Sequence, residues 1–157
     1  MNTADTVNDY DSKPETQEHI RNVNKFMREI VHLISERGPW HDSSKLQDPE
    51  LATFNEYTPK LKDCTYGSDE YKGYLKDMQS ALDHHYANNR HHPEHFENGI
   101  KDMNLIDIVE MFCDWKAATM RHNDGNLRKS IKINKERFGF GDTLESIFNN
   151  TVDLLDR

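Results

Sequence analysis

The sequence predicts an all-α protein, folded as a compact bundle of about six helices. Several segments repeat apolar residues with a period near 3.6, whereas no stretch alternates apolar and polar residues over the length of a strand. Glycine, proline and polar turn signals separate these periodic segments, so we expect each segment to form a helix of its own.

The first helix is expected to run from Thr16, its N-terminal cap, to about Arg37. The pair Gly38-Pro39 ends it, because glycine terminates a helix readily and proline cannot continue one. Its apolar residues recur at the spacing of one helix face, which we expect to point inward. They are Ile20, Val23, Phe26, Met27, Ile30, Val31 and Ile34.

The second helix is expected from about Pro49 to Tyr57, because Asp48 followed by proline is typical of a helix start. Residues 59–67 are expected to form a loop. Ser68 is a suitable cap for the third helix. Helices three to six are expected at residues 69–87, 105–122, 127–137 and 142–155, with a turn at 123–126.

The composition indicates one polar domain with a thin core. The chain has 157 residues, an apolar fraction of 34% and a formal net charge of −8 with its nine histidines neutral. Residues 1–15 are expected to form a flexible arm and residues 16–157 the single domain. The acidic balance argues against general nucleic-acid binding, which needs a basic surface.

Membrane and secreted classes are not expected. No apolar run approaches the roughly 18 residues of a membrane span, and the polar N-terminus lacks the apolar core of a signal peptide. Cys64 and Cys113 are too few for a disulfide framework and lack CxxC spacing. We therefore expect a cytoplasmic protein.

The histidines are unevenly distributed, and this points to a metal site. Five of the nine lie within twelve residues, and imidazole is the commonest metal ligand. These five are His84, His85, His91, His92 and His95.

Three other segments offer further ligand candidates. His41 and Asp42 are adjacent, directly after a helix end, and His19 lies on the inward side of the first helix. In the helix at 105–122, Asp107, Glu110, Asp114 and Arg121 share one face. For Glu110 we expect a solvated position. Asp114 is the better ligand candidate, because apolar residues crowd it; Asp107 replaces it if Asp114 points to solvent.

The run His41-Asp42-Ser43-Ser44-Lys45 resembles the HD-x-x-K signature of the HD superfamily of metal-dependent phosphohydrolases. Members of that superfamily are α-helical and have the ligand order H…HD…D. The pair His84-His85 is similar to the additional histidines of the HD-GYP branch, which binds two or more metals, and the segment that begins with Asp114 is similar to the one that carries its last aspartate.

Residues 17–151 also resemble small phage-associated HD-like proteins of uncharacterised function. The shared segments include HDSSKL, YTPKLK and ALDHHYANNRHHPEHF. This second resemblance is specific, but it implies little about activity.

The resemblance implies an HD-like helical bundle that holds one or two divalent transition metals. The first ligand set would be His19, His41, Asp42 and Asp114, with His84 and His85 around a second ion. Nitrogen and carboxylate donors together suit Mn, Fe, Co, Ni or Zn.

Other residues would act on the substrate. Lys45 is expected to clamp a phosphate at the catalytic centre, and Arg90 and Arg121 to bind substrate phosphate. One of three catalytic histidines would protonate the leaving group. The candidates for that role are His91, His92 and His95.

The expected function is metal-dependent hydrolysis of a nucleotide or another small phosphate ester. The alternative is a metal-stabilised HD-like binding protein without turnover, which sequesters a nucleotide or inhibits a host partner. A third interpretation is a purely structural helical domain whose histidines happen to cluster. The sequence favours the first interpretation over the third, and it leaves the first and second open, as it does the oligomeric state.

Overall fold

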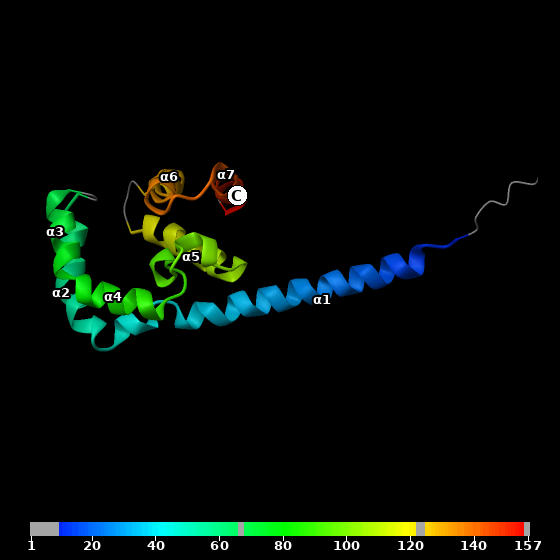
Figure 1. The fold of residues 1–157 in the computed structure, drawn as a ribbon, viewed down its shortest axis with the longest axis horizontal. Coiled ribbons are helices and arrows are strands. Elements are labelled where there is room, and N and C mark those ends of the chain that lie inside the picture. Colours follow the sequence, from blue (N-terminus) through cyan, green and yellow to red (C-terminus); the bar gives the residue numbers. More distant parts are fainter. Residues whose placement is uncertain (1–9, 66–67, 122–124, 156–157) are drawn as a thin grey trace, which may run out of the picture.

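The computed structural model describes residues 10–65, 68–121 and 125–155, and over these residues the chain is all-α, as predicted. Figure 1 shows helix α1 projecting from a body that the other helices form. The helices are α1 (Lys13–Arg37), α2 (Glu50–Asp63), α3 (Asp69–Asp77), α4 (Gln79–Asn88), α5 (Leu105–Thr119), α6 (Leu127–Phe138) and α7 (Asp142–Leu155). The short 3-10 helices are η1 (Gly38–Trp40), η2 (Ser43–Leu46), η3 (Pro93–His95) and η4 (Gly99–Asp102).

The start of α1 and the end of α2 differ from the prediction. Helix α1 begins at Lys13 rather than at Thr16, with Pro14 in its first turn, where a missing N–H costs no hydrogen bond. Residues 1–9 of the expected arm lie outside the described residues. Helix α2 continues through Pro59 to Asp63, where a loop was expected, because an internal proline removes one backbone bond and does not always end a helix.

The third predicted helix is divided in two. The backbone at Met78, with ψ near −1°, separates α3 from α4, and the side chain there is buried. Neither glycine nor proline stands at this point, so the sequence gives no signal for the break. The cap at Ser68 is confirmed, since its Oγ accepts a hydrogen bond from the Tyr71 N–H.

The later helices lie close to the predicted ranges. A capping box starts α5: the Asn104 side chain accepts bonds from the first turn, and Asp107 bonds back to the Asn104 N–H. The predicted end at His122 lies outside the described residues. Gly139 ends α6 with a φ of +65°, the left-handed conformation that glycine adopts without strain.

The apolar core lies at one end of the body, among α5, α6, α7 and Phe140. It consists of Met111, Phe112, Trp115, Leu127, Ile131, Phe140, Phe148 and Val152. On the side of α2, α3 and α4, Met78 and Ala81 are the buried apolar residues among those described. The junction between the two sides is instead built from buried polar groups, which include Glu50, His85, His91 and Asp107.

The expectation that α1 contributes to the core is wrong. No residue of α1 is buried, because only its C-terminal end packs against α5. We call six of its exposed apolar residues the α1 stripe, and their exposed fractions run from 40% to 62%. The α1 stripe comprises Ile20, Val23, Phe26, Met27, Ile30 and Val31.

None of the described helices combines the length and the apolar character that crossing a membrane requires.

Candidate metal centre

A sharp turn between η1 and η2 presents His41 and Asp42 to opposite sides. Asp42 adopts a left-handed φ of 56°, which a short polar side chain tolerates better than most. As a result His41 contacts Glu110 and Asp114 on α5, whereas Asp42 contacts His85 on α4. The turn therefore connects the two sides of the body.

Two groups of side chains have the composition and spacing to hold a metal ion. The first contains Asp42, His85, His91 and His92, and the second contains His41, His91 and Asp114. Within each group, one potential ligand atom per residue lies within 4.8 Å of all the others. His91 belongs to both groups, so they form one continuous cluster.

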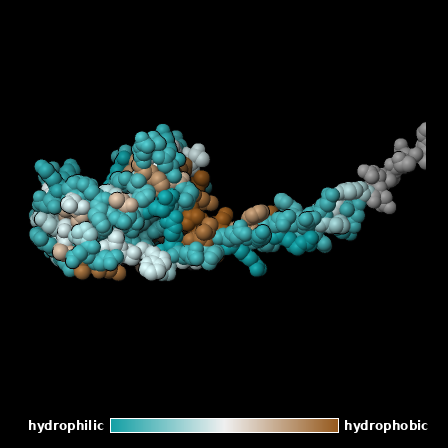
Figure 2. Space-filling view, turned by 60° about the horizontal axis from the view of Figure 1, so that its bottom comes forward, coloured by the Kyte–Doolittle hydropathy of each residue, from teal (hydrophilic) through white to brown (hydrophobic). Residues whose placement is uncertain are grey.

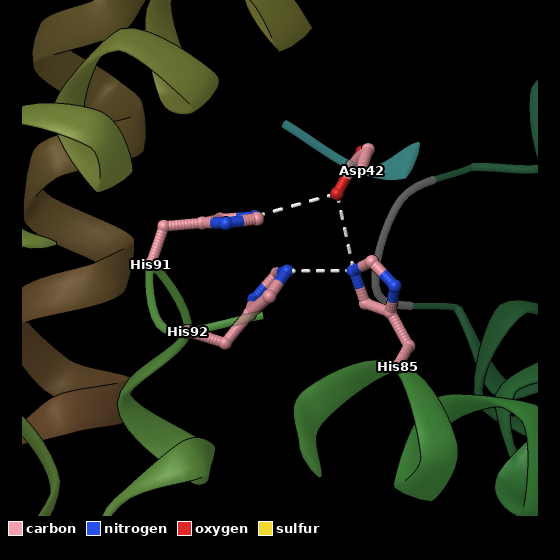
Figure 3. A group of neighbouring side chains, drawn as sticks. All are labelled: Asp42, His85, His91 and His92. Atoms are coloured by element: carbon pink, nitrogen blue, oxygen red, sulfur yellow. Dashed lines mark hydrogen bonds and ion pairs between the residues drawn. The ribbon is translucent and has the colours of Figure 1, made fainter. Parts of the chain in front are cut away.

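Figure 3 shows the side chains of the first group converging from three segments of the chain. The Asp42 Oδ1 atom lies 3.2 Å from His85 Nε2 and 3.4 Å from His91 Nε2. His85 Nε2 in turn lies 2.9 Å from His92 Nε2. In the second group, His41 Nε2 lies 3.5 Å from Asp114 Oδ1.

These contact distances are compatible with an ion at each group. Metal–nitrogen and metal–oxygen bonds of about 2.0–2.2 Å place neighbouring ligand atoms about 3–3.5 Å apart. Moreover, Asp42 Oδ1 and His91 Nε2 are buried and make no hydrogen bond of proper geometry to any described residue. Because a buried polar atom without a partner is costly, an ion bound between these two atoms would satisfy both of them.

Glu110 orients two of the histidines. Its Oε1 atom lies 3.0 Å from His41 Nδ1 and 3.2 Å from His91 Nδ1, and Arg37 donates to its Oε2 at 2.9 Å. Since an ionised carboxylate only accepts, both Nδ1 atoms must carry the proton. This leaves Nε2 as the ligand atom of each ring, and an ion at His41 would have to displace the proton that its Nε2 shares with Asp114.

Glu50 does the same for His85. It is fully buried, and its Oε2 lies 2.9 Å from His85 Nδ1 and 3.1 Å from the Ser44 hydroxyl that donates to it. Its Oε1 accepts from His84 Nδ1 at 2.7 Å. The paired carboxylate thus directs the Nε2 atom of His85 toward Asp42.

The site holds its carboxylates ionised. Burial opposes this, but the neighbouring imidazoles at Oδ1, together with the Lys45 ammonium, lower the pKa of Asp42. Similarly, despite burial, the contact with His41 lowers the pKa of Asp114, and hydrogen bonds from His41 and His91 lower that of Glu110 to about 2.

The pKa values of His41 and His92 are shifted in opposite directions. Hydrogen bonds to Asp114 and Glu110 raise the pKa of His41 to about 10. Burial and the neighbouring His91 and His85 lower the pKa of His92 to about 3, so that His92 is neutral at pH 7. In the absence of an ion, a proton on His41 balances part of the negative charge; a divalent cation would replace that proton.

A cavity of about 300 Å³ opens beside the second group, between the end of α1 and α5. His41, Glu110 and Asp114 line one part of it, and Arg37 lines the same part. The rest of the wall is mostly apolar and comprises Ile34, Ile106, Val109, Cys113 and Ala117. The side chains of His41 and Asp114 are 28% and 25% exposed, so this edge of the cluster is accessible.

Of the residues predicted as metal ligands, the structure brings together His41, Asp42, His85 and Asp114. Two of the predicted proton donors, His91 and His92, lie among the ligand atoms instead. This assignment differs because the loop after α4 folds back over Asp42, a tertiary contact that spacing does not reveal.

Three predicted histidines are not brought into either group. His19 is exposed on the projecting part of α1, because that helix does not pack along the body. His84 bonds to Glu50, as its position one residue off the buried face of α4 requires. His95 bonds through Nδ1 to the Tyr86 carbonyl oxygen at 2.8 Å.

Of the three side chains predicted to bind phosphate, one lies at the site and two do not. Lys45 lies at the site, with its ammonium 2.6 Å from Asp42 Oδ2. Arg90 is instead held by two bonds to Asp107, which is fully buried and also binds Arg37. Arg121 is exposed beyond the end of α5. Asp107 therefore anchors arginines, and Asp114 is the carboxylate that faces His41.

Sequence reasoning missed the roles of Glu110 and Glu50. The expectation of a solvated Glu110 was wrong, because the face it shares with Asp107 and Asp114 turns toward His41 and not toward solvent. That shared face was the available signal. For Glu50 the sequence offered none, since its histidine partners lie 34 and 35 residues away.

Comparison with protein-family models finds a match over residues 8–156, to a family of unknown function, DUF5662. No curated protein matches the chain, and no solved structure does.

Proposed function

The chain belongs to the DUF5662 family, and we propose that it is a metal-dependent phosphohydrolase acting on a nucleotide or another small phosphate ester. One observation carries the proposal: the Nε2 atoms of His41, His85 and His91 face Asp42 and Asp114, while buried or half-buried glutamates hold their Nδ1 atoms. Histidines are oriented in this way when they serve as ligands.

The donor set favours Mn, Fe, Co, Ni or Zn, because Ca and Mg prefer oxygen ligands alone. Since the two groups share His91, the cluster would hold one ion, or two ions with one at each group. A bound divalent cation supplies Lewis acidity toward a phosphoryl oxygen and lowers the pKa of water.

The protein's own residues supply the rest of a phosphate site. Lys45 and Arg37 place positive charge on either side of the cluster, which an anionic substrate needs in a chain of net charge −8. The apolar wall of the cavity beside His41 and Asp114 would receive a flat, weakly polar group such as a nucleobase.

Membership of the HD superfamily is part of the proposal. In its favour, the adjacent pair His41-Asp42 and the later Asp114 meet at one site, in the expected chain order. The first histidine of the H…HD…D pattern is not supplied by His19, so His85, His91 and His92 would complete the ligand set. The free thiols of Cys64 and Cys113 agree with a reducing compartment such as the cytoplasm.

A second candidate, a metal-stabilised binding protein without turnover, is favoured by the position of the apolar core. That core lies among α5–α7, while α2–α4 join it largely through the polar cluster. An ion at the cluster would therefore tie the two sides of the body together, whether or not catalysis occurs.

The two candidates are separated by metal analysis followed by an activity screen. We expect the purified protein to contain a transition metal and, with Mn or Co added, to release phosphate from nucleotides or p-nitrophenyl phosphate. His91→Ala should abolish this activity, whereas His32→Ala, on the exposed part of α1, should leave it unchanged. Bound metal without hydrolysis of any phosphate ester would support the second candidate, and the absence of metal would overturn both.

A further inference from the structure

The apolar face of α1 has no partner within the described chain. The six residues of the α1 stripe recur at helical spacing along the part of the helix that leaves the body, and all are 40% or more exposed. In water a single helix without packing along its length is only marginally stable, even at 25 residues. We propose that the α1 stripe is the dimerisation surface of this protein, and that its occupant is α1 of a second copy.

The size of the surface supports this occupant. The exposed area of the α1 stripe is on the order of 600 Å², at the upper limit for the largest apolar patch of a typical monomer and near the ~800 Å² that each partner buries in a stable interface. Figure 2 shows that hydrophobic surface also gathers where α1 meets the body. There the wall formed by Ile34, Ile106 and Val109 continues the apolar band.

Charge also favours a second copy. Helix α1 carries five basic and four acidic residues, for a formal net charge of +1, while the whole chain carries −8. The repulsion between two copies is therefore weakest where α1 meets α1. A near-neutral helix is also a poor match for an anionic membrane surface, which attracts helices rich in lysine and arginine.

The same charges determine the orientation. In a parallel pair, the two acidic bodies would lie side by side at the same end of the helices. An antiparallel pair about a two-fold axis places them at opposite ends of a helix about 37 Å long, at 1.5 Å per residue. Met27 stands midway between Ile20 and Ile34 and would lie near that axis.

Sedimentation velocity on the full chain tests the proposal. We expect a mass of twice 18.5 kDa for the native chain. The double variant Val23→Glu/Ile30→Glu should raise the dissociation constant by on the order of 100-fold, because it buries two carboxylates in the interface. Lys25→Glu is the matched control: it changes the net charge equally on the opposite face of α1 and should remain dimeric.

Other outcomes would overturn the proposal. These are a native chain that stays monomeric, a double variant that dimerises like the native chain, and a Lys25→Glu variant that dissociates as readily as the double variant. A monomer that binds anionic vesicles would instead make a membrane the occupant. Metal content, which depends on ligand groups that include no residue of the α1 stripe, would show that the body of each variant is folded.

Disulfide crosslinking tests whether the two α1 helices are antiparallel. In a Cys64→Ser/Cys113→Ser background, Met27→Cys should form an intermolecular disulfide under mild oxidation, and Lys25→Cys should not. Efficient crosslinking of Lys25→Cys, with none for Met27→Cys, would contradict the antiparallel dimer.

Discussion

The Oδ1 atom of Asp42 and the Nε2 atom of His91 lie 3.4 Å apart in the interior, and neither makes a well-formed hydrogen bond to a described residue. A cation bound between these two atoms would provide a partner for both of them. The carboxylate of Glu110 contacts the Nδ1 atom of His91 and so fixes the orientation of the imidazole ring. This pair is the centre of the proposed metal site.

His91 is the only residue common to both ligand groups found among the described residues, so its loss should be the most damaging of the single substitutions. We expect His91→Ala to weaken the binding of Mn, Co or Zn by at least ~100-fold, measured by competition with a chromogenic chelator. His32→Ala removes an exposed imidazole from α1 and serves as the control. Equal affinities for the two variants would contradict the assignment.

Glu110 should act as a positioning residue. Glu110→Gln keeps the shape but loses the charge that holds the Nδ1 proton on His41 and His91. We expect metal affinity to fall about 10–100-fold, and the nitrogen NMR shifts of both rings to report a loss of the single tautomer. The exposed residue Glu136 provides a matched control as Glu136→Gln. Unchanged tautomers would show that Glu110 only packs there.

Much of the fold could be predicted, because helix periodicity and caps are local signals. Ser68 and the turn at Gly139 mark their helix boundaries in the sequence itself. The division at the buried Met78 has no local signal, and the continuation through Pro59 goes against the usual local preference of proline. The exposure of α1 could not be predicted either, because an amphipathic stripe looks the same whether its partner is the chain's own core or another molecule.

The residue types of the candidate site could be predicted from the sequence, but most of the contacts among those residues could not. Clustered histidines and the His41-Asp42 pair identified the ligand types and most of the ligands. Helical spacing separates two neighbouring histidines: His85 continues the apolar stripe of α4 and is buried at the site, whereas His84 lies one residue off that stripe and bonds to Glu50. Glu50 acts on His84 and His85 from a distant segment and follows no spacing rule, whereas Glu110 shares a face of α5 with Asp114.

Asp107 and Asp114 lie two turns apart on α5, and their roles should separate cleanly. Asp107→Asn should lower the free energy of unfolding by about 1–3 kcal/mol, because Arg37 and Arg90 lose a buried anionic partner. Asp114→Asn should instead weaken metal binding with little effect on the stability of the metal-free protein. Denaturant unfolding and metal titration on both variants test this, and the reverse pattern would make Asp107 the ligand.

Metal binding should release protons. Because its two carboxylate neighbours raise the pKa of His41 to about 10, the metal-free protein holds that proton at pH 7 and an ion must displace it. Affinity should therefore increase as pH rises from 6.5 to 8.5, by about tenfold per pH unit for one proton. Calorimetry in buffers of different ionisation enthalpy counts the protons directly. A count of zero at pH 7 would exclude His41 as a ligand.

Removing the metal should weaken one side of the body more than the other. At a free-ion concentration of 100 Kd, binding adds about 2.7 kcal/mol to the free energy of unfolding, so a chelator should lower the melting temperature. Helices α5–α7 keep their apolar core around Ile131, whereas α2–α4 depend on the polar cluster that contains Glu50 and His85. Hydrogen exchange should accordingly speed up in α2 and α4 after chelation and change little in α6. A uniform change across all helices would show instead that the ion stabilises the body as a single unit, and no change would mean that the cluster holds together without it.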